Sequence, residues 1–310
     1  MTFSKLRLVL AIFFALLTAS TGICETFSFA IICDPHVDGT PSHKTGLEEA
    51  VNWIAANRQK KDIRFVFVLG DIAWGSSEGK KNILTARKIL DKLNTASIPY
   101  IPMPGDNEIE YGAQKDFNDI FADQYKHLQG ICENWQKSPV RLNNMYLQNF
   151  SFDYKDCHFV CPDFVSRKTQ KSGDIIDVND GSWNWFKNDI KTCPKTKLKN
   201  TVIFTHIGMF RTGIFFADEN LFSNSDLSKI KEFLTDYRDH IDSNYAGHIH
   251  KNLDWQVRGD SYNPLYTVRM TANLTNTHKI IIRCVSVDTS DPKISYNQKI
   301  ETIDIPASVK

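Results

Sequence analysis

The chain has 310 residues, enough for one large domain or two ordinary ones. Hydrophobic residues make up 42% and charged residues 24%, which excludes a disordered or collagen-like chain. The 37 Lys and Arg nearly balance the 36 Asp and Glu, so the positive excess typical of a nucleic-acid-binding surface is absent, and no nucleic-acid partner is expected.

The N-terminal segment has the residue order of a secretory signal peptide. Lys5 and Arg7 precede an apolar run at 8–17, and small residues follow at 18–22. The apolar run is shorter than the roughly 20 residues that span a bilayer, so we favour a signal peptide over 1–22, cleaved as late as residue 24, and not an uncleaved membrane anchor. Cleavage would change the formal charge from +1 to −1 and leave no stable membrane span. The mature chain is then expected to be secreted, periplasmic or extracellular.

Cysteine usage agrees with export. Six cysteines remain after the signal peptide, an even number that suits an oxidising compartment. Cys157 and Cys161 stand four residues apart in one predicted strand, about 13 Å at 3.3 Å per residue. A disulfide needs Cα atoms within about 7 Å, so we expect these two not to pair with each other.

Strand and helix patterns alternate at the start of the mature chain. Residues 27–33 and 63–69 are apolar almost throughout and predict buried strands, and 98–103 predict a third, shorter strand. Between the three strands, apolar residues recur at helical spacing over 46–57 and 83–93. This order of βαβ units predicts a parallel sheet covered on both faces.

The remaining chain continues the α/β pattern. Further strands are predicted at 150–154, 157–161, 201–205, 265–270 and 280–287, and helices at 181–191, capped by Asp180 or Ser182, and within 221–237. Residues 109–149 and 207–246 are long enough to form specificity loops over a site. No repeat or Pro/Gly-rich linker divides the sequence, so we expect a single domain over 23–310.

Carboxylates and imidazoles stand directly after four of the predicted strands, and two further imidazoles follow in Gly247-His-Ile-His250. They are Asp34, His36, Asp71, Asp106, His206, His248 and His250. The steps from Asp34 to Asp71 to Asp106 are each about one βαβ unit long. Such units bring their strand ends together at the sheet edge where α/β proteins bind ligands. Oxygen and nitrogen ligands of these kinds suit Fe, Mn or Zn about equally.

This ordered series resembles the calcineurin-like metallophosphoesterase family. The resemblance runs from 27 to 250 and rests on Asp34-Pro-His36, Gly70-Asp71, Gly105-Asp-Asn-Glu108, Thr205-His206 and Gly247-His-Ile-His250. It implies an α/β sandwich in which central mixed β-sheets are flanked by helices. It also implies a site for two metal ions that hold a hydroxide for in-line attack on phosphorus.

The resemblance also implies a ligand for each motif. Asp34, His36 and His250 would bind the first metal, and Asp71 would bridge both metals. Asp106, His206 and His248 would complete the second. Glu108 is expected beside the site and not as a direct ligand.

One motif departs from the family pattern. The family usually has Gly-Asn-His-Glu or Gly-Asn-His-Asp where this chain has Gly105-Asp-Asn-Glu108. Asp106 then stands at the ligand position and remains a competent ligand. Asn107 stands at the position of the family's catalytic histidine, and an amide cannot give up a proton near neutral pH. General acid catalysis is typically worth about 10² to 10⁴ in rate, so this substitution bears directly on activity.

Three functions follow from these observations. The leading hypothesis is a secreted, metal-dependent phosphatase or phosphodiesterase acting on a small phosphate ester. The alternative is a metal-binding protein of the same fold with weakened or lost hydrolase activity, which Asn107 makes conceivable. A nuclease would also fit the fold, but the charge balance does not support it.

Overall fold

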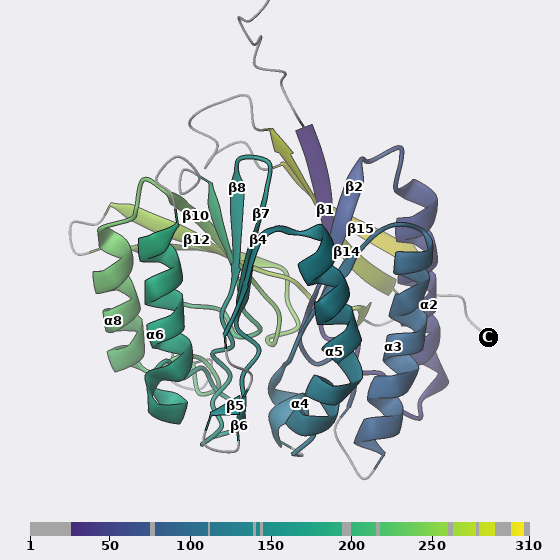
Figure 1. Ribbon diagram of the computed structural model, residues 1–310, viewed down its shortest axis with the longest axis horizontal. Helices are drawn as coiled ribbons and strands as arrows, with labels where there is room; N and C mark the ends of the chain where they lie inside the picture. The colour runs from purple at the N-terminus through teal and green to yellow at the C-terminus, as the bar shows by residue number, and fades with distance from the viewer. Residues whose placement is uncertain are drawn as a thin grey trace, which may run out of the picture.

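Two β-sheets lie face to face at the centre of the computed structural model, and helices cover their outer faces (Figure 1). The structure describes residues 26–74, 78–110, 112–138, 141–142, 145–193, 200–214, 218–259, 263–276, 279–288 and 299–306. The predicted signal peptide and its cleavage site lie outside these ranges.

The described residues form strands and helices with the following bounds. The strands are β1 (Thr26–Ile32), β2 (Ile63–Leu69), β3 (Tyr100–Met103), β4 (Glu133–Lys137), β5 (Arg141–Leu142), β6 (Met145–Tyr146), β7 (Phe150–Tyr154), β8 (Cys157–Cys161), β9 (Thr201–Phe204), β10 (Ile241–Ala246), β11 (Leu253–Arg258), β12 (Pro264–Met270), β13 (Thr275–Asn276), β14 (Lys279–Asp288) and β15 (Lys299–Pro306). The helices are α2 (Pro41–Asn57), α3 (Gly79–Thr95), α4 (Asp106–Glu110), α5 (Gln114–Ile131), α6 (Asp177–Thr192) and α8 (Asn224–Thr235).

Both central sheets are mixed. The first sheet has the order β13-β14-β1-β2-β3, with β15 beside β14, and the second has the order β11-β12-β10-β9-β8-β7-β4. Strands β1, β2 and β3 run parallel, as the βαβ pattern predicts, whereas β14 pairs antiparallel with β1. In the second sheet β8, β9, β10 and β12 are parallel. The predicted fold, mixed sheets flanked by helices, is confirmed.

Aromatic side chains fill the space between the two sheets. Phe29 and Phe67 project from the first sheet, and their rings lie 5.9 and 3.6 Å from those of Phe159 and Phe204 of the second. All four are buried. Alternation along each strand places these rings on the face that meets the opposite sheet. The sandwich is thus closed by an apolar interface that fixes one sheet against the other.

Helices cover the outer face of each sheet. Figure 1 shows α2, α3 and α5 beside the first sheet and α6 and α8 beside the second. Helix α2 begins five residues before the predicted start, at Pro41, whose fixed φ suits the first turn of a helix. Helix α6 begins at Asp177 with Ile176 at its N-cap, so the predicted caps Asp180 and Ser182 lie inside the helix. That cap prediction is wrong.

The long segments predicted as loops contain regular structure. Helix α5 and strand β4 occupy much of 109–149. In 207–246, helix α8 confirms the helix predicted within 221–237, whereas strand β10 was not predicted. Strand β10 carries the buried polar residues Ser243 and Asn244, which interrupt the apolar run that marks the other buried strands. A search for continuous apolar runs therefore does not identify β10 as a strand.

Within the described ranges, the six cysteines from Cys33 to Cys284 form no disulfide. Cys157 and Cys161 lie in the same strand, β8, and are not bonded to each other, as expected from their spacing. Among the described residues, no helix combines the length and the apolar character needed to cross a bilayer.

Candidate metal centre

The seven predicted ligand residues meet at one end of the sandwich, where parallel strands of both sheets end. Asp34 and His36 follow β1, and Asp71 follows β2. Asp106 opens α4 just after β3, His206 follows β9, and His248 and His250 follow β10. The structure divides them into two groups, each of which could hold a metal ion.

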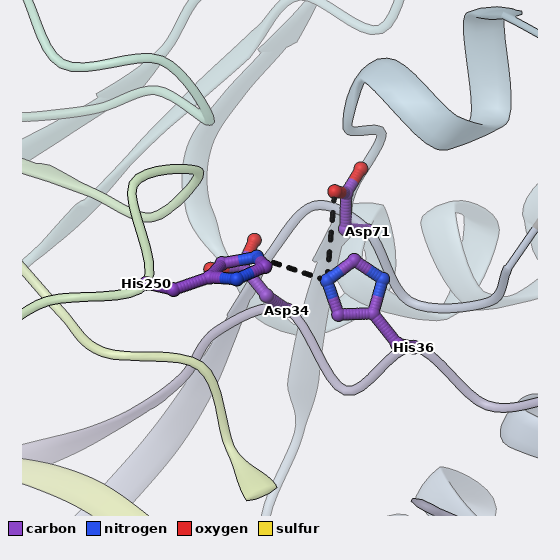
Figure 2. Close-up of side chains that lie close together, drawn as sticks. All are labelled: Asp34, His36, Asp71 and His250. Carbon is purple, nitrogen blue, oxygen red and sulfur yellow. Dashed lines mark hydrogen bonds and ion pairs between the residues drawn. The ribbon is translucent and has the colours of Figure 1, made fainter. Parts of the chain in front are cut away.

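The first group consists of Asp34, His36, Asp71 and His250 (Figure 2). One ligand atom from each residue lies within 4.8 Å of the others. The Nε2 atom of His36 is 3.0 Å from Nε2 of His250 and 3.8 Å from Oδ2 of Asp71. A hydrogen bond between these two nitrogens requires that one of them carries a hydrogen and donates it. If neither carries a hydrogen, their two lone pairs face each other and repel. A cation between them would use both lone pairs.

The second group consists of Asp106, His206 and His248. Oδ1 of Asp106 is 2.7 Å from Nε2 of His206 and 2.9 Å from Nδ1 of His248. His206 donates from Nδ1 to the carbonyl oxygen of Leu69 at 2.9 Å. This hydrogen bond fixes the proton on Nδ1 and leaves Nε2 available as a ligand atom.

Asp71 lies between the two groups. Its Oδ2 faces His36 of the first group, and its Oδ1 is 3.5 Å from Nε2 of His206 in the second. Oδ1 also accepts a hydrogen bond from the backbone N–H of Asn107 at 2.9 Å. The geometry suits a carboxylate shared by two ions, which is the role that the resemblance implies for it.

The ligand loops are held in strained backbone conformations. Five of the seven residues have positive φ, between 46° and 70°: Asp34, His36, Asp71, His248 and His250. This left-handed region is uncommon for side chains other than glycine, and such residues cluster at functional sites. The loops also approach closely, because a Cβ on Gly105 would lie 2.2 Å from the backbone nitrogen of Asp71.

Two interactions brace these loops from behind. Glu108 is fully buried, and its two carboxylate oxygens accept backbone hydrogen bonds from Ala73 at 3.0 Å and Gly105 at 2.7 Å. It therefore joins the β2 and β3 loops and contributes no ligand atom to either group. Across the sandwich, Asp34 accepts a hydrogen bond from the backbone N–H of His248 at 3.0 Å, which joins a loop of each sheet.

Burial keeps the histidines of the first group neutral. It lowers the pKa of His36 to about 3, with a further contribution from the neighbouring His250 and His206. Burial also lowers the pKa of His250, again assisted by nearby histidines. A neutral imidazole is the form that binds a metal, so both rings are ready ligands at neutral pH.

The pKa values of the carboxylates shift in opposite directions, although burial raises the pKa of each. Burial raises the pKa of Asp34 to about 7 and raises that of Asp71 well above its usual range. For Asp106 burial acts in the same direction, but hydrogen bonds from His206 and His248 outweigh it and lower the pKa. Crowded, desolvated carboxylates of this kind gain most from a nearby cation.

Asn107 contacts the first group directly. Its side-chain Nδ2 lies 3.1 Å from Nδ1 of His36, and the residue is buried. The sequence predicts Asn107 at the site but does not identify the side chain that it contacts. The structure shows that the partner is His36.

Trp74 belongs to none of the sequence motifs, yet it lies beside the first group. Its indole is 44% exposed, and its ring lies 5.3 Å from that of His36. The backbone of Trp74 is fixed, because its N–H donates to Val37 at 3.0 Å and its carbonyl accepts from Asn82 at 3.2 Å. The only sequence signal for Trp74 is its position three residues after Asp71 of the Gly70-Asp71 motif.

A third group of similar residues lies elsewhere, at Asp153, His158 and Cys193. His158 Nδ1 contacts Asp153 at 2.7 Å, and Nε2 contacts Asp189 at 2.9 Å. Both ring nitrogens are therefore engaged within the protein. In contrast, the donors of the first two groups have the chemistry and spacing that fit two metal ions.

Comparison with known proteins agrees with this geometry. The family model for calcineurin-like phosphoesterases matches residues 27–252. No curated protein sequence matches the chain. Among solved structures, a dimetal phosphatase from Danio rerio is similar with a TM-score of 0.57 and 14% identity, covering 91% of this chain and 99% of that one.

Two further structures are similar over 91% of this chain. A purple acid phosphatase from yellow lupin (Lupinus luteus) seeds has a TM-score of 0.55, 12% identity and 52% of its chain covered. A putative 5′-nucleotidase from Staphylococcus aureus has a TM-score of 0.51, 16% identity and 54% of its chain covered. At these identities the likeness concerns the fold. The family match, over most of the chain, is decisive: the chain belongs to the calcineurin-like phosphoesterase family and is a metal-dependent phosphoester hydrolase.

Proposed function

We propose that the protein is a secreted phosphoesterase that hydrolyses small phosphate monoesters or diesters at the two ligand groups. Asp34, His36 and His250 would hold the first ion, Asp71 both ions, and Asp106, His206 and His248 the second. The observation that carries this assignment is the position of Asp71, with one oxygen facing each group. We further propose that residues 1–22 are removed on export and that 23–310 form a single domain.

The two ions, when bound, supply the positive charge that stabilises the phosphoryl oxygens during displacement. The protein keeps their ligands in place. Glu108 and the Asp34–His248 hydrogen bond fix the loops, so the ligand atoms need little rearrangement. Trp74 provides an exposed aromatic surface beside the first group, where the organic part of an ester would lie.

Asn107 is best suited to orienting His36. The Nε2 atom of His36 faces Asp71 and His250, so binding a metal through Nε2 requires the proton on Nδ1. The group opposite Nδ1 is the Asn107 amide, and a half-turn of that amide presents its oxygen to the Nδ1 proton. Asn107 would then hold the metal-binding tautomer, a role that needs no proton transfer.

A second candidate function follows from the same residue. Because Asn107 cannot protonate a leaving group, the protein could bind two metals yet hydrolyse esters poorly. Esters with good leaving groups need no such acid, so the two candidates differ in whether even an ester with a good leaving group is turned over.

Turnover of p-nitrophenyl phosphate and its bis ester, with Mn²⁺, Zn²⁺ or Fe²⁺, tests the proposal. We expect hydrolysis of at least one ester and a steep loss of rate with poorer leaving groups. Stoichiometric metal with no turnover of either ester would favour the metal-binding function. Mass measurement of the exported protein tests the signal peptide, and a mature chain that retains residues 1–22 would contradict it.

A further inference from the structure

A cavity of about 630 Å³ lies between α5 and β4, outside both ligand groups. Its walls include the rings of Tyr125, Trp135 and Tyr146, and two lysines, Lys126 and Lys137, line it. Among the described residues that line it, none is acidic and none belongs to the metal centre. The volume is that of pockets that bind small organic molecules.

Lys137 places a half-buried amine at this cavity, and no carboxylate of the described residues forms an ion pair with it. Its Nζ donates to Oε1 of Gln148 at 2.7 Å and lies 4.1 Å from the centre of the Tyr125 ring. Asp163, the carboxylate whose charge acts on the Lys137 pKa, already forms an ion pair, because both its oxygens bond the guanidinium of Arg167 at 2.7 and 2.6 Å. Burial lowers the pKa of Lys137 to about 7.

The surroundings of Lys137 hold this amine in place. Gln148 donates from Nε2 to Asn118 at 3.1 Å and from its backbone N–H to Asp163 at 3.0 Å, so the acceptor of Lys137 cannot move freely. An ammonium has three donors, and the structure assigns one of them to Gln148. Neutral partners and ring faces only partly offset the cost of burying a charge. An anion entering the cavity would offset the rest.

The aromatic walls indicate the shape of that anion. The Tyr125 and Trp135 rings lie 6.5 Å apart, and Trp135 stacks on Phe150 at 5.3 Å with an interplanar angle of 15°. The indole is thus held rigidly from behind while it borders the cavity. Rigid ring faces favour a flat, apolar ligand body.

We propose that this cavity binds a small aromatic carboxylate, with its carboxylate at Nζ of Lys137 and its ring against Trp135 and Tyr146. A single ammonium matches one negative charge. The site is independent of the proposed function, since it shares no residue with the metal centre.

Benzoate binding to the metal-loaded protein, followed by calorimetry, tests the proposal. Lys137→Met keeps the aliphatic stem over Tyr125 but removes the charge, and we expect it to weaken benzoate binding at least about tenfold. Lys187→Met is the matched control, because Lys187 also lies over an aromatic ring, Trp183 at 5.4 Å, outside the cavity. It should bind benzoate as the wild type does. Thermal unfolding of each variant verifies that it is folded.

Three further measurements separate this site from the metal centre and from simpler explanations. Benzamide lacks the charge and acetate lacks the ring, so each should bind at least about tenfold more weakly than benzoate. Asp71→Asn should leave benzoate binding in the cavity unchanged. Equal binding to wild type and Lys137→Met, or loss of binding in Asp71→Asn alone, would overturn the proposal, as would no detectable binding of benzoate.

Discussion

Two clusters of aspartate and histidine occupy opposite ends of the second sheet and behave differently. His158 lies near the start of β8, beside the first residue of the parallel strand β9, whereas His206 follows the end of β9. Both histidines are buried and both contact carboxylates. Residue type alone therefore does not distinguish a metal centre from a structural ion-pair network.

The cluster around His158 is satisfied internally. Its two ring nitrogens bond Asp153 and Asp189, and the remaining oxygens of these carboxylates accept from Asn134 at 2.5 Å and Ser151 at 2.6 Å. Burial alone would lower the pKa of His158, but the two carboxylates outweigh it and raise the pKa to about 11. The imidazolium is itself the cation of this cluster.

The first group of the metal centre is not satisfied in this way. In the first group, nitrogen faces nitrogen between His36 and His250, and burial keeps both rings neutral. Carboxylates crowd together on backbone that is strained at five of the seven positions. A cluster that binds an external cation therefore differs from a structural ion-pair network in its donor atoms, which face each other and not a cation of the protein.

The largest expected effect is that of removing the carboxylate shared by both groups. Asp71→Ala should lower turnover by about 10³-fold or more, because it removes a ligand from each ion. Steady-state kinetics and metal analysis measure this. Asp62→Asn, an exposed change at the other end of β2, should leave both unchanged. Retained activity in Asp71→Ala would contradict the assignment of Asp71 as a ligand of both ions.

The opposite pattern is expected at His158. His158→Leu leaves two buried carboxylates without their cation and should cost about 3 to 5 kcal/mol of unfolding free energy. Urea unfolding measures the loss, and kcat of the folded fraction should stay within about twofold of wild type. A fall in metal content would show that the His158 cluster also binds an ion.

Metal removal should act on one cluster alone. A ligand present at 100 times its Kd stabilises the folded state by about 2.7 kcal/mol, so chelation should lower the Tm of the wild type. Asp71→Ala should show little change on chelation, while His158→Leu should show the wild-type shift from a lower starting Tm. Equal shifts in all three proteins would point to metal bound elsewhere.

Substitutions of Asn107 test whether its contact with His36 supports metal binding. Asn107→Leu cannot accept the Nδ1 proton, and loss of such a partner typically weakens metal binding 10- to 100-fold. Asn107→Asp retains an acceptor and should keep the wild-type affinity or exceed it. Competition with a fluorescent chelator measures both. Equal affinities in the Leu and Asp variants would remove Asn107 from this role.

The smallest effect, taken per pH unit, is a pH dependence of stability that arises from His158. Its pKa is raised from 6.5 to about 11 on folding, so the folded chain holds this proton more tightly. The stabilisation is fully present below about pH 6.5 and is lost as the pH rises towards 11, by at most about 1.4 kcal/mol per pH unit. Unfolding free energies of wild type and His158→Leu should therefore converge with rising pH, and a constant difference would contradict the assignment.

Much of the fold could be predicted because its signals are local. The apolar runs of β2 and β8 have the predicted bounds, since a strand buried on both faces needs such a run. Strand β10 could not be found this way, because Asn244 is buried there to bond Thr205 at 2.9 Å and Met209 at 2.9 Å. Its polarity reflects a tertiary role, not a surface position.

The sequence alone was enough to identify the family and the seven ligand candidates, five from the ends of predicted strands and His248 and His250 from their motif. Parallel strands bring their carboxyl ends to one edge, so order and spacing along the chain were enough. Only the tertiary structure decided which side chains face each other: Asp71 between two groups, Asn107 against His36, and His158 as a buried cation. These pairings join residues distant in the sequence, and packing of the two sheets sets their distances.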